Sequence, residues 1–385
     1  MANNLTAFEQ WKSRPADERY WDIAELRTAA DNVRRNCVEK EGIPLSQCHA
    51  QVQGNGLELT GPNGAPVAFT HFSFSQVCKS LSIPAEYIRS VSPQLAAANL
   101  NERFHSVQKD PVTALLQRRA DQPNALRSFT SKRYARVWNS EVLEFVADLE
   151  SRGWRVPPAR PAGIANERTR IATMADVLEA GSHPDLSVKV GDLVAPAGLY
   201  MNDRSMFTFL VNVQQPIDVE GVRGFRGVYI WNSEVGDATL GMRMFFFNSV
   251  CGNHIVWGEK LYREIRLRHI GEVSRRFDNA RYEITTAANQ SVELEVKQIT
   301  AARRQVIADT KEQVVELVYD RLRGLWSQKT VDAIYDTADQ WAHIHGPANT
   351  VWGMVSGATR YSQLLPCDER DLMDQQAGRL LAMAN

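Results

Sequence analysis

The sequence has few cysteines, and their spacing suits neither a disulfide framework nor a metal site. Five cysteines are spread over 385 residues, and none belongs to a C-x-x-C pair. They are Cys37, Cys48, Cys78, Cys251 and Cys367. An odd and widely spaced set argues against a disulfide-stapled secreted fold and against a cysteine zinc site. We therefore expect a reducing compartment, the cytoplasm, and no bound metal.

Long hydrophobic runs and a secretory leader are absent too. No stretch approaches the roughly 18 consecutive apolar residues of a membrane-spanning helix. The first residues contain no basic stretch followed by an apolar segment, so we expect no signal peptide and no membrane partner. The formal net charge is -1, so any affinity for nucleic acid must come from local basic patches.

The motifs that bind common cofactors are also missing. The chain has no phosphate-binding loop, no dinucleotide-binding glycine motif, no H-E-x-x-H pair and no G-x-S-x-G turn. The only close histidine pair is His343 and His345, and no cysteine or third histidine is near them. An ordinary surface or core pair is the better interpretation, so we expect no metal and no cofactor.

The hydrophobic patterning predicts an α+β fold with a central, mostly antiparallel sheet and helices packed on it. Alternation with a period of two dominates residues 186–255, and further strands are expected at residues 112–117 and 126–130. A length of 385 residues suggests more than one domain. The expected divisions are an N-terminal helical segment (1–50), an α+β core (51–290) and a C-terminal helical region (291–385).

Helical spacing of apolar residues predicts the remaining elements. Residues 1–42 are expected to be helical, and residues 73–91 to form two short helices. Residues 292–326 carry one apolar face, which predicts a single helix roughly 50 Å long. Such a helix would pack on the body of the protein or on a second copy of the chain, so a homo-oligomer is expected.

Two basic segments are candidates for contact with nucleic acid. The first lies between residues 117 and 136 and alternates with aromatic residues, and the second lies between residues 260 and 281. Their candidate binding residues are Arg127, Phe129, Lys132, Arg133, Tyr134, Arg136, Arg266 and Arg268. Arginine side chains beside aromatic rings can bind phosphates and stack on unpaired bases. The alternative for both segments is a solvated surface with mixed charges.

A third region, residues 227–258, places polar side chains among aromatic and aliphatic ones. Buried polar groups need partners, so a structural polar network is expected from Asn232, Ser233, Glu234 and Asn253. The alternative is a ligand pocket or active site with Glu234, Cys251 and His254 as the catalytic candidates. A thiol and an imidazole close together could support nucleophilic chemistry, although Cys251 suits a small buried hydrophobe better.

Several strings in this region resemble a family catalogued as domain of unknown function 932, found in phage- and plasmid-like proteins. The strings are Trp231-Asn-Ser-Glu-Val-Gly236, Val250-Cys-Gly-Asn-His-Ile-Val-Trp-Gly258 and Arg266-Leu-Arg-His269. Weaker similarity extends the resemblance from about residue 69 to residue 361. The resemblance implies a protein of a mobile element in the cytoplasm of a bacterial host. It assigns no activity.

Three functions remain open from these observations. The favoured hypothesis is binding of single-stranded nucleic acid, as an annealing or recombination accessory. A second is an interaction protein that inhibits a host defence complex, for which only the phage-like resemblance speaks. The third is an enzyme or small-ligand binder that uses the residues around Glu234 and His254. A continuous basic groove would favour the first, and a closed pocket would favour the third.

Overall fold

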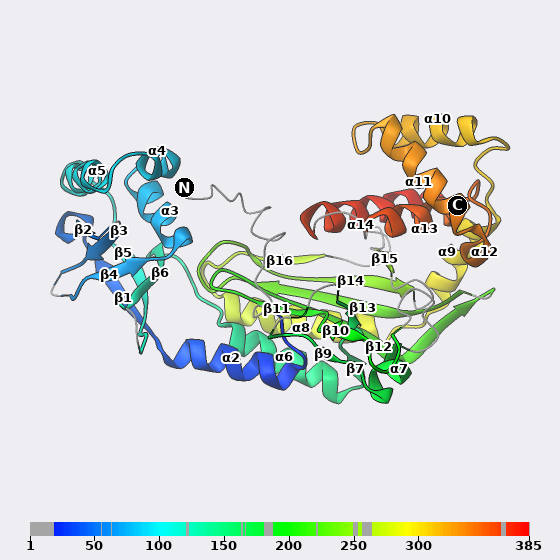
Figure 1. The fold of residues 1–385 in the computed structure, drawn as a ribbon, viewed down its shortest axis with the longest axis horizontal. Helices are drawn as coiled ribbons and strands as arrows, with labels where there is room; N and C mark the ends of the chain where they lie inside the picture. Colours follow the sequence, from blue (N-terminus) through cyan, green and yellow to red (C-terminus); the bar gives the residue numbers. More distant parts are fainter. Residues whose placement is uncertain are drawn as a thin grey trace.

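The computed structural model has the α+β architecture that the sequence predicts, with mostly antiparallel sheets. It describes residues 19–384, apart from residues 55, 63, 121–122, 163–164, 166, 181–187, 221, 249–252, 256–263 and 363–366. A small sheet with its helices, a large central sheet and a group of C-terminal helices follow one another along the chain (Figure 1). No helix in the described ranges is long and apolar enough to cross a membrane.

The small sheet has six strands in the order β1-β5-β6-β4-β3-β2, with one parallel pair, β4 with β6. The strands are β1 (Cys37–Ile43), β2 (His49–Gln53), β3 (Gly56–Thr60), β4 (Val67–Phe69), β5 (Val112–Gln117) and β6 (Ala125–Ser131). Its helices are η2 (Leu45–Gln47), α3 (His71–Ser80), α4 (Ala85–Ser90) and α5 (Pro93–Ser106). Sheet and helices enclose a hydrophobic core of their own, which includes Val77, Leu100 and Leu126.

Local sequence signals set the starts of the helices in this part of the chain. Thr70 accepts a hydrogen bond from the backbone N–H of Ser73, whose side chain bonds back to Thr70, so the pair forms a capping box for α3. The Ser92 side chain caps α5 by accepting a hydrogen bond from the backbone N–H of Leu95, and Pro93 occupies the first turn, where a missing N–H does no harm. The expected pair of short helices over residues 73–91 is confirmed as α3 and α4.

The large sheet has seven strands, and its main path runs β11-β12-β13-β14-β15. The strands are β11 (Leu199–Met201), β12 (Met206–Val219), β13 (Val222–Asn232), β14 (Leu240–Asn248), β15 (Asn253–Ile255), β16 (Ile265–Leu267) and β7 (Trp154–Arg155). β16 pairs with β14, and β7 pairs with β12 at the outer edge of the sheet. A separate three-stranded sheet has the strand order β8 (Arg160–Pro161), β10 (Leu193–Ala195), β9 (Arg170–Ile171). The helix α7 (Met174–Ala180) follows β9 along the chain.

One face of the large sheet carries aliphatic side chains and packs on three helices. The helices are α2 (Ile23–Arg35), α6 (Asn139–Ser151) and α8 (Val273–Ala288). Leu210, Val228, Ile230 and Met242 from the sheet belong to one buried cluster with residues of these helices, such as Phe277. Burial of a side chain of this size stabilises the fold by about 1.5–3 kcal/mol.

The C-terminal region is helical, as expected, but its first part is not one long helix. It contains α9 (Glu293–Arg304), α10 (Lys311–Arg321), α11 (Gln328–Gln340), α12 (Ala342–His345), α13 (Val351–Ser362) and α14 (Cys367–Leu381). The single helix predicted over residues 292–326 is therefore wrong. α13 and α14 contact β15, and α9 contacts β12, so the region packs at one end of the large sheet.

The break between α9 and α10 has a tertiary cause. Val306 forms an isolated bridge with Thr350, and the backbone N–H of Ile307 donates to the carbonyl of Asn349 at 2.8 Å. This strand-like pairing pulls residues 305–308 out of helical geometry. Thr310 then caps α10 with its side chain. The apolar face that continues over residues 292–326 gives no indication of the bridge to Thr350 or of the new helix start at Thr310.

The N-terminal part departs from the prediction as well. Residues 1–18 lie outside the described residues, and α2 covers only part of the expected helical stretch 1–42. Cys37–Ile43 forms β1, which pairs antiparallel with β5 at the edge of the small sheet. The charged side chains of this segment suit the exposed surface of a helix, but an edge strand tolerates them equally well.

A buried ion pair joins the large sheet to the helices beneath it. Arg226 on β13 is 1% exposed and donates to the Glu295 carboxylate at 2.5 Å. Its other N–H groups donate to the carbonyls of Ala288, Gln290 and Ser291 at the end of α8. A charge removed from water needs such a complete set of partners.

We expect Arg226→Ala to lower the free energy of unfolding by about 3–5 kcal/mol, because Glu295 would stay buried without its cation. Urea unfolding followed by circular dichroism measures this change. The matched control is Arg275→Ala on α8, whose side chain is 77% exposed and which should change stability little. Equal stability of the two variants would contradict a structural role for the Arg226 pair.

Candidate functional site

The second face of the large sheet differs from the first, because it carries aromatic rings and arginines. Residues paired across antiparallel strands point to the same side of a sheet, so the register defines three rows on this face. The rows are Tyr200-Phe207-Trp231-Gly241-Arg266, Phe209-Tyr229-Arg243 and Arg155-Val211-Gly227-Phe245. We call this set, together with Phe225, the aromatic face. Part of it forms a hydrophobic cluster separate from the main core.

Two glycines let rings lie flat on this face. A Cβ atom on Gly241 would lie only 1.9 Å from the ring of Trp231, and one on Gly227 only 2.2 Å from the ring of Phe245. Each glycine is the cross-strand partner of the residue whose ring covers it. Without side chains at these positions, the rings can rest against the backbone of the sheet.

The rings stack on one another across the strands. Phe209 and Tyr229 are nearly parallel, with centroids 4.5 Å apart, and Phe207 lies 5.8 Å from Tyr229 at an interplanar angle of 6°. Trp231 follows at 5.0 Å from Tyr229. Such stacking buries Phe207 and Trp231 almost completely, whereas Phe209, Tyr229 and Phe225 remain partly exposed.

Two of the three arginines on the aromatic face lie beside its rings. The guanidinium of Arg243 lies 5.4 Å from the ring of Trp231 and 5.8 Å from that of Tyr229, within the range of cation–π attraction. Arg266 approaches Trp231 from β16 at 6.0 Å, and both arginines bind Glu264. Arg243 is nearly buried, whereas the side chain of Arg266 is 61% exposed. Positive charge therefore lines one edge of the aromatic face.

The structure brings the two basic segments of the sequence together at this edge. Tyr134 forms an isolated β-bridge with Ile270, and the backbone N–H of Ala135 donates to the carbonyl of His269 at 2.9 Å. The ring of His269 stacks on Tyr134 with centroids 5.1 Å apart. We call this junction the seam, because it joins the small sheet to the large one. Lys132, Arg133 and Arg268 are exposed around it.

A buried polar network fixes the seam from inside. Arg127 on β6 and Glu234, which follows β13, are 3% and 1% exposed and form an ion pair at 2.8 Å. The second oxygen of Glu234 accepts the backbone N–H of Asn139 at 2.8 Å, at the start of α6. A carboxylate there also benefits from the positive end of the helix dipole. Burial alone would lower the pKa of Arg127, but Glu234 and Cys37 beside it raise that pKa.

Neighbouring residues complete this network. Asn232 donates to the carbonyl of Val137 at 2.9 Å and to the side chain of Asn139 at 2.8 Å. The hydroxyl of Tyr134 donates to the carbonyl of Ser233, whose own hydroxyl donates to the carbonyl of Arg204. Each side chain therefore ties the segment after β13 to a different element, and the segment serves as the joint between the sheets.

The candidate nucleic-acid residues fall into two groups. Arg127 and Phe129 are buried, and the side chain of Arg136 is 3% exposed and binds Glu39 and the Glu234 carbonyl. These three cannot form the external surface expected of them, because their side chains support the seam instead. The exposed members are Lys132, Arg133, Arg266 and Arg268, with Tyr134 partly exposed. Lys132 has Asp110 at 3.8 Å.

The catalytic candidates are not brought together. Glu234 lies beyond the Trp231–Gly241 end of the β13–β14 pair, whereas His254 on β15 pairs with Phe247 at the opposite end. Six strand residues separate these ends, a distance on the order of 20 Å. Cys251 lies outside the described residues, as do the side chains of Asn253 and His254. Within the residues that can be described, no cluster suited to a metal ion is found.

Sequence reasoning missed most of the aromatic face. For Phe207, Phe209, Tyr229, Arg243 and Phe245 the sequence predicts strands and nothing more. The available signal was the period of two, which puts Phe207 with Phe209 and Arg243 with Phe245 on single faces. Which face they share across strands depends on the register, and one residue of slip would reverse it.

The seam should make stability depend on pH. Burial lowers the pKa of His269 to about 4, so the folded protein resists a proton that the unfolded chain accepts near its ordinary value of about 6.5. Because the unfolded state binds more protons in this window, stability should decrease as pH falls from about 6.5 to about 4. His345, with a pKa of about 4, adds to the same trend.

We expect His269→Asn to reduce this pH dependence by up to about 3 kcal/mol over that window. Urea unfolding at a series of pH values measures the slope. The control is His105→Asn on α5, where the side chain is exposed. An unchanged slope in the His269 variant would mean that protonation of this ring does not oppose folding.

Comparison with known proteins identifies a family. The family model described as "Domain of unknown function (DUF932)" matches residues 127–364, well over half of the chain. No curated protein and no solved structure matches the chain. The matched region begins in β6 and contains the seam, the whole aromatic face and the helices from α6 to α13. The chain therefore belongs to the family of the domain of unknown function 932.

Proposed function

We propose that this protein binds single-stranded nucleic acid across the aromatic face, with the phosphates held by arginines at the seam. The observation that supports this function best is the combination of flat, stacked rings with exposed arginines along one edge of the same sheet face. Bases would pack against the exposed parts of Phe209, Tyr229 and Phe225. Arg266 and Arg268 would contact the backbone.

A single strand suits this surface better than a duplex does. In a duplex the faces of the bases are already stacked on one another, whereas an unpaired strand offers them to protein rings. Stacking of one base on an aromatic side chain contributes about 1–3 kcal/mol and requires no particular sequence. With a formal net charge of -1, the protein would depend on this local arrangement and not on a global attraction to phosphate.

The cellular role we propose is that of an accessory in annealing or recombination of a phage or plasmid, acting in the bacterial cytoplasm. A surface that stacks bases without reading sequence can hold two strands while they search for complementarity. Self-association of the protein would line up several such surfaces. This role rests on the family resemblance for its setting and on the aromatic face for its chemistry.

The proposal predicts a loss of both affinity and salt dependence when the edge arginines are removed. Arg266→Ala combined with Arg268→Ala should reduce the slope of log K against log salt by about 1.4, since each phosphate contact on a single strand contributes about 0.7. Fluorescence anisotropy with labelled DNA at several salt concentrations measures this slope. The control is Arg323→Ala, whose side chain is 74% exposed. It follows α10, a helix that lies away from the large sheet in Figure 1.

A second prediction concerns stacking. Tyr229→Ala should weaken binding of single-stranded DNA by about 5- to 150-fold, the equivalent of one lost base–ring contact. Tyr282→Ala on α8 is the matched control, because this ring is 74% exposed on the helix that packs against the aliphatic face. Binding to no oligonucleotide at low salt would refute the proposed function outright.

A further inference from the structure

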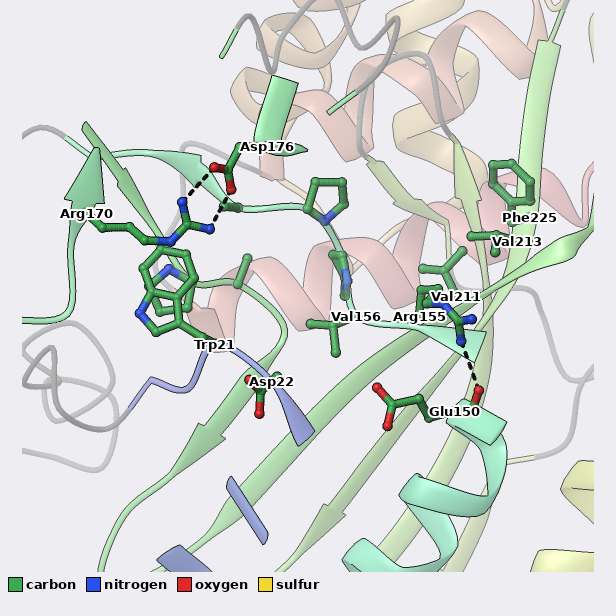
Figure 2. Close-up of a pocket in the computed structure, with 15 residues that line it drawn as sticks. Trp21, Asp22, Glu150, Arg155, Val156, Arg170, Asp176, Val211, Val213 and Phe225 are labelled. Carbon is green, nitrogen blue, oxygen red and sulfur yellow. Dashed lines mark hydrogen bonds and ion pairs between the residues drawn. The ribbon is translucent and has the colours of Figure 1, made fainter. Parts of the chain in front are cut away.

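A pocket of about 620 Å³ opens where the aromatic face reaches the β7 edge of the large sheet (Figure 2). Val211 and Phe225 belong to both the aromatic face and the wall of this pocket. A nucleic-acid strand bound on the aromatic face would therefore pass the opening of this pocket. The volume falls within the usual range for small-molecule sites and exceeds what one planar base requires.

The opposite wall is an aromatic ring held by an ion pair. The guanidinium of Arg170 lies 4.3 Å from the ring centroid of Trp21 and binds both oxygens of Asp176 at 2.6 Å. Asp176 also accepts hydrogen bonds from the backbone and hydroxyl of Thr173. Together these contacts hold the pKa of the Asp176 carboxyl well below its usual range. The ring is thus positioned before any ligand arrives, which reduces the entropy lost on binding.

The remaining charged groups favour a ligand that donates hydrogen bonds. Arg155 is turned toward the protein, where it donates to the carbonyls of Glu150 and Trp154 at 2.9 and 2.8 Å. The carboxylates of Asp22 and Glu150 lie at the pocket in Figure 2. Asp22 uses one oxygen to accept the backbone N–H of Glu25 and so caps α2.

This charge pattern argues against a phosphate inside the pocket. Arg170 neutralises Asp176. Arg155 keeps its positive charge beside Glu150, because hydrogen bonds to carbonyls do not neutralise it. The carboxylates of Asp22 and Glu150 still leave the lining with a net negative charge. Carboxylates accept hydrogen bonds from the exocyclic amino groups of bases, as in recognition of the cytosine amino group. Thymine and uracil have no such group, and they would present a carbonyl oxygen to these acceptors.

We propose that this pocket holds one unpaired base with an exocyclic amino group, extruded from the strand that binds the aromatic face. The inference rests on the proposed function and adds a base preference to it. Glu150 accepts the amino group, Val156 beside it supplies an apolar wall (Figure 2), and the phosphates stay outside.

The test compares binding of dC and dT oligonucleotides of roughly 20 nucleotides, long enough to cover the face. We expect the protein to bind the dC strand about fivefold or more tightly, at a pH above 7 where cytosine is neutral. Glu150→Gln should bring the two affinities close together, since an amide can also donate to the thymine carbonyl. Glu144→Gln, an exposed glutamate on the same helix, should leave the preference intact.

A second variant guards against an indirect effect of the charge change. Val213, which lines the pocket and is 45% exposed, can be replaced by tryptophan to fill the space without altering charge. Val213→Trp should also abolish the preference while binding of dT persists. Equal binding of dC and dT by the unmodified protein, or a preference that survives Glu150→Gln, would overturn the pocket assignment alone. Failure to bind either strand would overturn the proposed function.

Discussion

The buried ion pair between Arg127 and Glu234 is the contact on which the arrangement of the two sheets depends. Arg127 comes from the small sheet, Glu234 from the end of a strand of the large one, and both are almost completely buried. Losing one partner would leave the other charge buried without its counterion, which typically costs about 3–5 kcal/mol. The N-terminus of α6 adds a third partner through the backbone of Asn139. These contacts hold the two sheets together at this point.

The joint between the two sheets also determines which cations lie at the edge of the aromatic face. Because Arg127 and Arg136 bind the segment after β13, the chain that follows β6 must run beside the segment after β16. Exposed cations from two distant parts of the sequence then meet at one edge of the aromatic face. Arg127 and Arg136, which the sequence suggests as nucleic-acid contacts, instead hold this joint. Their buried contacts position the exposed cations.

Local patterns were enough to predict the fold class, the paired strands β5 and β6, and the short helices α3 and α4. They failed where tertiary pairing competes with local preference. Val306 pairs with Thr350 and divides a continuous amphipathic stretch into α9 and α10, and the charged Cys37–Ile43 segment becomes a strand because β5 offers it partners. The aromatic face was hidden for a related reason. Alternation reveals which residues of one strand share a side, whereas the meeting of Trp231 with Gly241 needs the register between strands.

The two faces of the large sheet differ in composition. The face toward α8 uses leucine, isoleucine, valine and methionine, which fill a core without polar atoms. A sheet that only needed a second core could use the same residues on its other face. Instead, the other face has glycines against which the rings of Trp231 and Phe245 lie. It also keeps the Arg243 side chain almost fully buried, despite the cost of desolvating a charge. Rings with cations among them match the planar faces and charged backbone of an unpaired strand. This composition is the physical reason why we propose a binding role for this face.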